Sequence, residues 1–136
     1  MTSFQLDPRL EADGPVVAEL PLCQVRLVDD ARFVWLVLIP RRDGLMEIFD
    51  IPAPERAVLM EEIAAVGAAV KAASGCAKLN VAALGNMVRQ LHVHVMGRDP
   101  GDPAWPGPVF GFGAREPLAP EAMAERLATL RSALAS

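Results

Sequence analysis

Positive charge is sparse and scattered in this sequence of 136 residues, and long apolar runs are missing. The formal net charge is −4, and Arg41-Arg42 is the only adjacent pair of basic residues. Contact with a nucleic-acid backbone needs a clustered positive face, so the composition argues against a nucleic-acid-binding protein. The longest apolar run, Phe33 to Pro40, is far too short to cross a bilayer, and we expect no membrane partner.

Cysteine is scarce as well, and the first residues lack the features of a secretory leader. The stretch from Met1 to Asp7 has neither a positive charge nor an apolar core. Cys23 and Cys76 lie far apart in the sequence, each in apolar surroundings. We therefore expect buried, reduced thiols rather than a disulfide, and a cytoplasmic location.

Apolar residues alternate with a short period in several stretches, which predicts β-strands. The stretches with this character are Leu22 to Val28, Phe33 to Pro40, Lys78 to Leu84 and Gln90 to Met96. A hairpin-length turn, Asp29 to Arg32, separates the first two, so we expect neighbouring strands to run antiparallel.

Two other stretches carry apolar residues at helical spacing. In the first, Leu59, Ile63, Val66 and Val70 predict a long helix near residues 54–74 that ends at Gly75. The second predicts a C-terminal helix at about residues 120–135, after a loop at 99–119 that is rich in proline and glycine. We expect a single α+β domain spanning residues 1–136, with an antiparallel sheet of about five strands.

The two histidines of the chain, His92 and His94, stand two residues apart in the segment Gln90 to Met96. Because side chains alternate along a strand, the aliphatic residues between them enter the core. Three polar side chains then share the opposite face, those of Gln90, His92 and His94. This face is open to three interpretations: a merely polar surface, a catalytic site, or a metal site, because imidazoles at this spacing can share a cation. No Asp, Glu or Cys adjoins the pair, so we predict no metal and no cofactor.

Gly85 and Asn86 form a turn that leads into the histidine segment. Glycine permits a tight reversal with backbone N–H groups turned outward, which suits phosphate oxygens near His92. A Gly-Asn pair is also typical of an ordinary hairpin, so the turn alone leaves both interpretations open.

Asn80, Gly85 and the segment Gln90-Leu91-His92-Val93-His94-Val95-Met96 together resemble the signature of the histidine triad (HIT) superfamily. In that family, a His-φ-His-φ-His-φ-φ motif (φ, apolar) follows an Asn and a phosphate loop that contains Gly. The resemblance covers about residues 23–98, which would form the core of the domain. Gln90 stands where the first histidine usually lies, and Met87 where many members carry a phosphate-binding Ser or Thr. Together with Ala104-Trp105-Pro106, the glutamine resembles a bacterial subgroup with the pattern Gln-x-His-x-His.

The resemblance implies a nucleotide-binding hydrolase or transferase that cleaves a nucleoside phosphate conjugate at the α-phosphorus. The middle histidine of the motif maps to His92, which would attack phosphorus through a neutral ring nitrogen and form a nucleotidyl-histidine intermediate. His94 would donate a hydrogen bond to a non-bridging oxygen. Gln90 would position the leaving group without acting as its acid. The resemblance also implies a homodimer.

Five residues are predicted to contact the substrate. Asn80, Gly85 and Asn86 would lie at the phosphate, and Asp30 would accept from the ribose hydroxyls unless it is an ordinary turn residue. Trp105 is either a lid over a nucleobase or a plug of the core. Two other functions stay open at this point: a nucleotide-binding regulator without turnover, and a small metal-binding protein.

Overall fold

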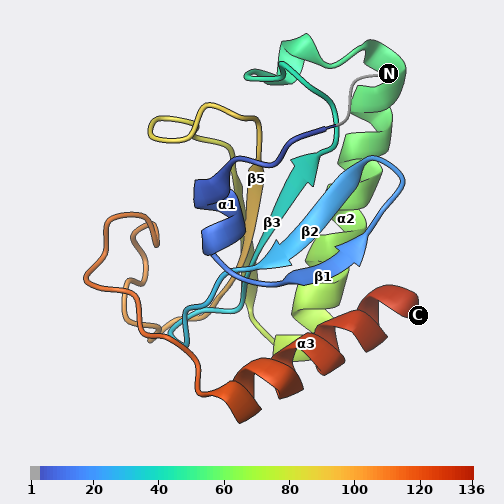
Figure 1. The fold of residues 1–136 in the computed structure, drawn as a ribbon. Helices are drawn as coiled ribbons and strands as arrows, with labels where there is room; N and C mark the ends of the chain where they lie inside the picture. Colours follow the sequence, from blue (N-terminus) through green and yellow to red (C-terminus); the bar gives the residue numbers. More distant parts are fainter. Residues whose placement is uncertain (1–3) are drawn as a thin grey trace.

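The computed structural model describes residues 4–136 and folds them around one antiparallel sheet (Figure 1). Its five strands are β1 (Val16–Glu19), β2 (Cys23–Leu27), β3 (Trp35–Pro40), β4 (Lys78–Ala82) and β5 (Val93–Arg98). They lie in the order β1-β2-β3-β5-β4, so β4 forms one edge of the sheet. The helical elements are α1 (Pro8–Ala12), the 3-10 turn η1 (Ile48–Asp50), α2 (Ala53–Ser74) and α3 (Pro120–Ala135). This arrangement confirms the predicted α+β fold.

The long helix α2 begins and ends close to where the sequence places it. Pro52 and Pro54 suit its start, where a backbone N–H has no partner within the helix. At the other end, Gly75 takes the left-handed conformation with a φ of 69°, and its N–H donates to the Lys71 carbonyl. Three residues of the predicted stripe are buried in the core: Leu59, Val66 and Val70.

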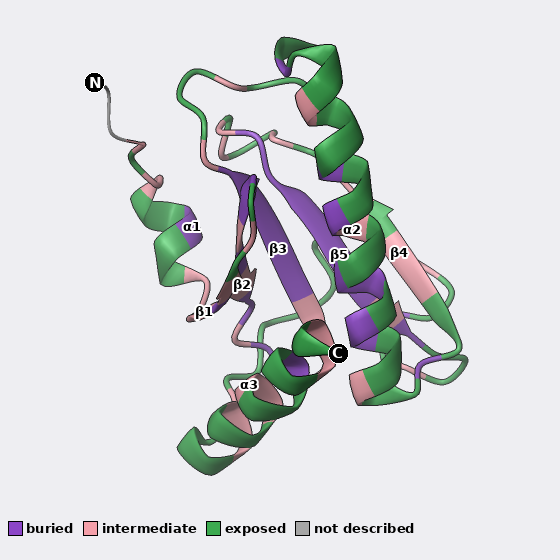
Figure 2. Ribbon diagram, turned by 90° about the vertical axis from the view of Figure 1, so that its right-hand side faces the viewer, coloured by how far each residue is buried: buried purple, intermediate pink, exposed green. Residues whose placement is uncertain are grey.

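Different segments of the chain cover the two faces of the sheet (Figure 2). Helices α2 and α3 cover one face, where Leu38 of β3 joins the main core. On the other face, residues 4–12, here called the N-terminal segment, place Leu10 against Val37 of the same strand. A second cover on this face comes from the loop after β5, which packs Val109 into a cluster with the strand residue Met96. Successive residues of a strand therefore enter opposite layers.

A carboxylate is buried between α2 and the sheet. The two oxygens of Glu62 each accept a backbone N–H at 2.8 Å, one from Leu22 and one from Cys23. Glu62 thereby fixes the point at which β2 begins. Burial, together with this carboxylate, raises the pKa of the Cys23 thiol far above its usual range, so the thiol stays protonated. Cys23 and Cys76 are both buried and free, as predicted.

Three features of the fold differ from the prediction. Strand β5 begins at Val93 rather than at Gln90, because the Leu91 N–H donates to the Leu45 carbonyl outside the ladder between β3 and β5. The sequence pattern also missed α1 and β1, which have five and four residues and are too short for a periodic signal.

No helix within residues 4–136 is long and apolar enough to span a membrane.

Candidate active site

His92 lies just before β5, and a backbone carbonyl fixes the position of its proton. Its Nδ1 is 2.7 Å from the carbonyl oxygen of Gln90. A carbonyl oxygen only accepts, so Nδ1 of the neutral ring must carry the hydrogen. The second ring nitrogen, Nε2, then keeps its lone pair. His92 is 7% exposed and lines a cavity described below.

His94 lies on β5, opposite Val37 of β3 and Ala82 of β4. Its ring centroid is 4.9 Å from that of His92, so the two imidazoles are in contact, as their spacing predicts. Burial of the ring, followed by the charge that His92 acquires on protonation, lowers the pKa of His94 from 6.5 to about 4. His94 is therefore neutral at neutral pH.

Two aromatic residues that the sequence analysis did not single out enclose His94. The indole N–H of Trp35 lies 3.0 Å from His94 Nδ1, and the ring of Phe110 lies 4.9 Å from the imidazole, centroid to centroid. The period of two along β3 could have identified Trp35, because Val37 occupies the same face two residues later. Phe110 belongs to the loop after β5, where no periodic pattern predicts which side chain turns inward.

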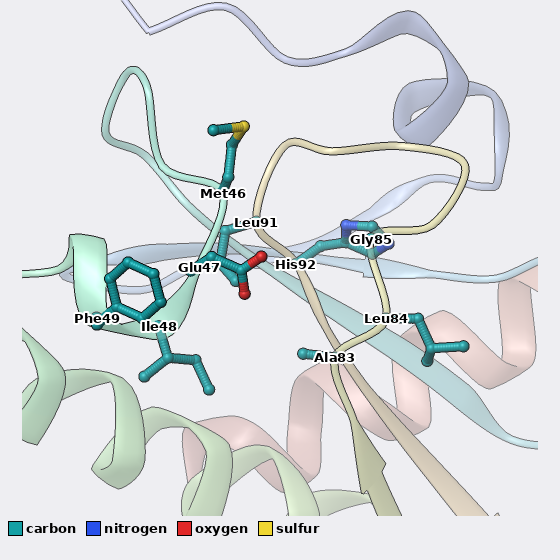
Figure 3. Close-up of a pocket in the computed structure, with 9 residues that line it drawn as sticks. All are labelled: Met46, Glu47, Ile48, Phe49, Ala83, Leu84, Gly85, Leu91 and His92. Carbon is teal, nitrogen blue, oxygen red and sulfur yellow. The ribbon is translucent and has the colours of Figure 1, made fainter.

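A cavity of about 160 Å³ lies between the loop before β5 and the segment after β3 (Figure 3). Figure 3 shows the ring of His92 directed toward the loop at Gly85. Gly85 has a φ of 70°, a conformation that glycine adopts without the cost a side chain brings. Asn86 follows it and is exposed to solvent. Gly85 therefore lies at the same cavity as His92, whereas Asn86 is not among the residues that line it.

The side-chain amide of Gln90 binds the N-terminal segment, whereas the sequence predicted that it contacts a leaving group. Its Oε1 accepts the backbone N–H of Asp7 at 2.8 Å, and its Nε2 donates to the Gln5 carbonyl at 2.9 Å. Both polar atoms of the side chain thus hold the N-terminal segment, and Arg9 adds a hydrogen bond to the Met87 carbonyl. The predicted contact of this amide with a leaving group does not match the placement. The backbone of Gln90, in contrast, orients His92.

Asn80 lies on β4 and accepts a hydrogen bond from Arg98 at 2.8 Å through its Oδ1. Arg98 is 1% exposed and also forms an ion pair with Asp102, with 2.7 Å between Nε and Oδ2. Its hydrogen bonds hold the pKa of Asp102 at about 2. Asn80 lines a hollow beside β4 together with Phe110, whose ring also packs against His94. Asn80 is therefore linked to His94 only through Phe110, and it does not line the cavity at His92.

Two predicted substrate contacts are not brought to this site. Asp30 is 1% exposed, and Arg32 occupies both of its carboxylate oxygens through hydrogen bonds of 2.8 to 3.1 Å. Burial opposes ionisation of Asp30, but the hydrogen bonds from Arg32 outweigh it and lower the pKa. Trp105 lies against the guanidinium of Arg98, and it is Phe110 that this loop places on His94. The ribose role of Asp30 and the lid role of Trp105 do not match these positions.

Metal binding would need several ligands close together. Among residues 4–136, no group of three or more His, Cys, Asp or Glu side chains is arranged so that it could hold a metal ion. The groups that the histidine pair and the adjoining loop present are imidazole nitrogens and backbone N–H groups.

The chain is similar to solved structures over nearly its whole length. A histidine triad protein from Sinorhizobium meliloti 1021 is 47% identical with a TM-score of 0.93, over 95% of this chain and 96% of that one. Another from Marinobacter aquaeolei VT8 is 42% identical with a TM-score of 0.95, over 98% of each chain. A hypothetical histidine triad nucleotide-binding protein from Sulfolobus tokodaii strain7 shares the fold at 18% identity, with a TM-score of 0.72 over 94% and 88% of the chains.

A comparison with curated proteins found no match. The HIT domain matches residues 9–101, which hold the histidine pair, the loop at Gly85 and all five strands of the sheet. The chain therefore belongs to the HIT domain family.

Proposed function

We propose that this protein is a nucleotide-binding hydrolase or transferase that cleaves a nucleoside phosphate conjugate at its α-phosphorus. The observation that carries the proposal is the hydrogen bond from His92 Nδ1 to the Gln90 carbonyl, which leaves Nε2 unprotonated near the loop at Gly85. A neutral ring nitrogen of this kind is a suitable nucleophile toward phosphorus. Membership of the HIT domain family supports the proposal, as does the description of the Sulfolobus tokodaii protein as nucleotide-binding.

The reaction proceeds in two displacements. His92 Nε2 forms a bond to the α-phosphorus while the bond to the leaving group breaks, and the leaving group departs with the electron pair. Water or another acceptor then attacks the same phosphorus, loses a proton, and returns the electron pair of the N–P bond to Nε2. Hydrolysis releases a nucleoside monophosphate, and transfer to another acceptor gives a new conjugate. Splitting one difficult step into two lower barriers is the general advantage of covalent catalysis.

His94 and the loop at Gly85 stabilise the charge that develops on the phosphoryl oxygens. His94 donates a hydrogen bond to a non-bridging oxygen, and backbone N–H groups after Gly85 add to it. Each preorganised donor of this type is typically worth about 3 kcal/mol, or about a hundredfold in rate. Because the low pKa of His94 keeps its ring neutral, it acts as a hydrogen-bond donor and not as a cation.

We place the chain in the bacterial subgroup with the pattern Gln-x-His-x-His, on the basis of Gln90, His92 and His94. An amide cannot act as an acid at neutral pH, and both polar atoms of this one are bound to the N-terminal segment. Leaving groups that depart as weak bases, such as phosphate or pyrophosphate chains, should therefore react faster than amines, which need protonation.

The remaining substrate contacts come from the loop and from β4. Gly85 and Asn86 lie at the phosphate, where backbone N–H groups and the exposed amide of Asn86 reach the oxygens. Asn80 faces the hollow that it lines with Phe110. Because Asn80 Oδ1 accepts from Arg98, its amide nitrogen is the atom that it offers to a substrate.

We propose further that the protein forms a homodimer through β4. This strand lies at the edge of the sheet, and an unpaired edge can pair with a second copy of itself. Val81 on β4 and Leu84 just after it are 52% and 46% exposed, so pairing of this edge with a second copy would cover apolar side chains. Sedimentation should give twice the mass of the chain, and Val81→Lys should lower it to that of a monomer. A wild-type monomer at all concentrations would contradict the dimer.

A product screen by mass spectrometry tests the proposed reaction. Wild-type protein and His92→Ala are incubated with a panel of adenylated and guanylated compounds that differ in the leaving group. The wild type should release a nucleoside monophosphate and give an acid-labile adduct on His92. His92→Ala should lose turnover by about a thousandfold or more, while nucleotide affinity stays within about threefold.

Calorimetric binding and urea unfolding of the same variant show whether the substitution has damaged the fold. Turnover by His92→Ala within a few-fold of wild type would mean that the nucleophile is assigned wrongly. Saturable nucleotide binding by the wild type without any product would instead favour a regulator.

A further inference from the structure

The hydrogen bond between Trp35 and His94 determines which nitrogen of His94 carries its proton. The indole N–H lies 3.0 Å from His94 Nδ1, and it can only donate. His94 Nδ1 must therefore accept, and in the neutral ring the hydrogen lies on Nε2. We propose that Trp35 is a positioning residue that holds His94 in the Nε2–H form and directs this N–H to the phosphoryl group. The directing role rests on the proposed function, whereas the state of the ring does not.

The surroundings of His94 oppose the alternative ring orientation. A half-turn of the imidazole would replace Nδ1 by a C–H group and leave the indole N–H without its acceptor. Phe110 and His92 both pack against the ring with centroids 4.9 Å away, and His94 is 9% exposed. Three rings and one hydrogen bond thus hold a single orientation of the imidazole.

The two histidines then have opposite forms, although they are two residues apart in one segment. His92 carries its hydrogen on Nδ1, because its partner is the Gln90 carbonyl, which only accepts. His94 carries its hydrogen on Nε2, because its partner is the Trp35 indole, which only donates. The pair therefore offers the substrate one lone pair and one N–H, both at Nε2. These are the two different groups that nucleophilic attack and oxyanion stabilisation require.

Long-range ¹H–¹⁵N correlation spectra of protein labelled in histidine test the inference without any substrate. The chain has two histidines, and the spectrum of His94→Asn assigns them. In the wild type, His92 should show a protonated Nδ1, and His94 a protonated Nε2 with an accepting Nδ1. Trp35→Phe keeps an aromatic ring but removes the N–H, so the Nδ1 signal of His94 should shift toward that of a ring exchanging between both forms.

Kinetics with the best substrate test the directing role. Trp35→Phe should lower kcat about tenfold and leave KM within about twofold, because the misplaced donor acts mainly in the transition state. Trp105→Phe is the matched control: it makes the same chemical change in the neighbouring loop, where the indole lies against Arg98, and it should leave the His94 signals unchanged.

A protonated Nδ1 on His94 in the wild-type spectrum would overturn the inference even if Trp35→Phe failed to fold. Unchanged His94 signals and unchanged kcat in a folded Trp35→Phe protein would overturn it as well. If the wild type turned over none of the compounds, the proposed function would fail. The spectra would then still decide whether Trp35 fixes the form of His94.

Discussion

Folding moves the pKa of His94 from 6.5 to about 4, because the ring becomes buried and lies beside His92. The unfolded chain therefore takes up a proton near pH 6.5, whereas the folded protein does so only near pH 4. The stabilisation that depends on a neutral His94 is fully present above pH 6.5 and is lost as the pH falls from 6.5 toward 4. Each pH unit of this difference is worth about 1.4 kcal/mol. His94 alone should lower the free energy of unfolding by about 2.5 kcal/mol between pH 7 and pH 4.5.

Urea unfolding of wild type and His94→Asn at several values between pH 7 and pH 4.5 measures this contribution. Asparagine places an acceptor near the position of Nδ1, so the Trp35 N–H keeps a partner, but the side chain does not titrate. Titrating groups that do not contact His94 affect both proteins alike and cancel in the difference. The wild type should lose about 2.5 kcal/mol more than the variant over this range. Loss curves that agree within about 0.5 kcal/mol would refute the burial argument.

Two other substitutions test contacts of single side chains. Glu62→Gln keeps the shape but replaces one acceptor oxygen by a donor, so one of the two N–H groups at the start of β2 loses its partner. The free energy of unfolding should fall by about 2 kcal/mol in urea titrations, and a change below about 0.5 kcal/mol would contradict the assignment. Gln90→Ala should release the N-terminal segment, so that trypsin cleaves it several-fold faster. Gln5→Ala is the control, because Gln5 contributes only its backbone carbonyl. Equal cleavage rates of wild type and Gln90→Ala would show that the Gln90 amide does not hold the N-terminal segment.

The sequence predicted the parts of the fold that depend on repeated apolar spacing. Helix α3 was expected at about residues 120–135 and spans Pro120–Ala135, because a stripe of four apolar residues and a proline mark it. The contact between His92 and His94 was predictable for the same reason, since residues two apart on a strand share a face. Periodicity thus predicts which face of an element a side chain takes.

The partners of polar and loop side chains were not predictable in this way, whether they are near or far in the sequence. Asp30 belongs to a predicted hairpin turn, where side chains usually face solvent, yet it is 1% exposed and forms an ion pair of 2.8 Å with Arg32. Gln90 was assigned to the substrate because it precedes the histidines, but its amide binds the N-terminal segment, which no local pattern indicates. Phe110, rather than Trp105, reaches His94 because the path of the loop decides it. Such contacts depend on the whole fold.

The hydrogen bonds between Gln90 and the N-terminal segment also have a consequence for the order of folding. The Asp7 N–H and its acceptor on Gln90 are 83 residues apart, so closing this contact costs more chain entropy than forming the hairpin between β2 and β3. During synthesis, the N-terminal segment cannot form this contact until Gln90 has also left the ribosome. Until the contact forms, the apolar side chains of Leu10 and Val37 do not cover each other. We therefore expect the N-terminal segment to join the sheet after the hairpin between β2 and β3 has formed.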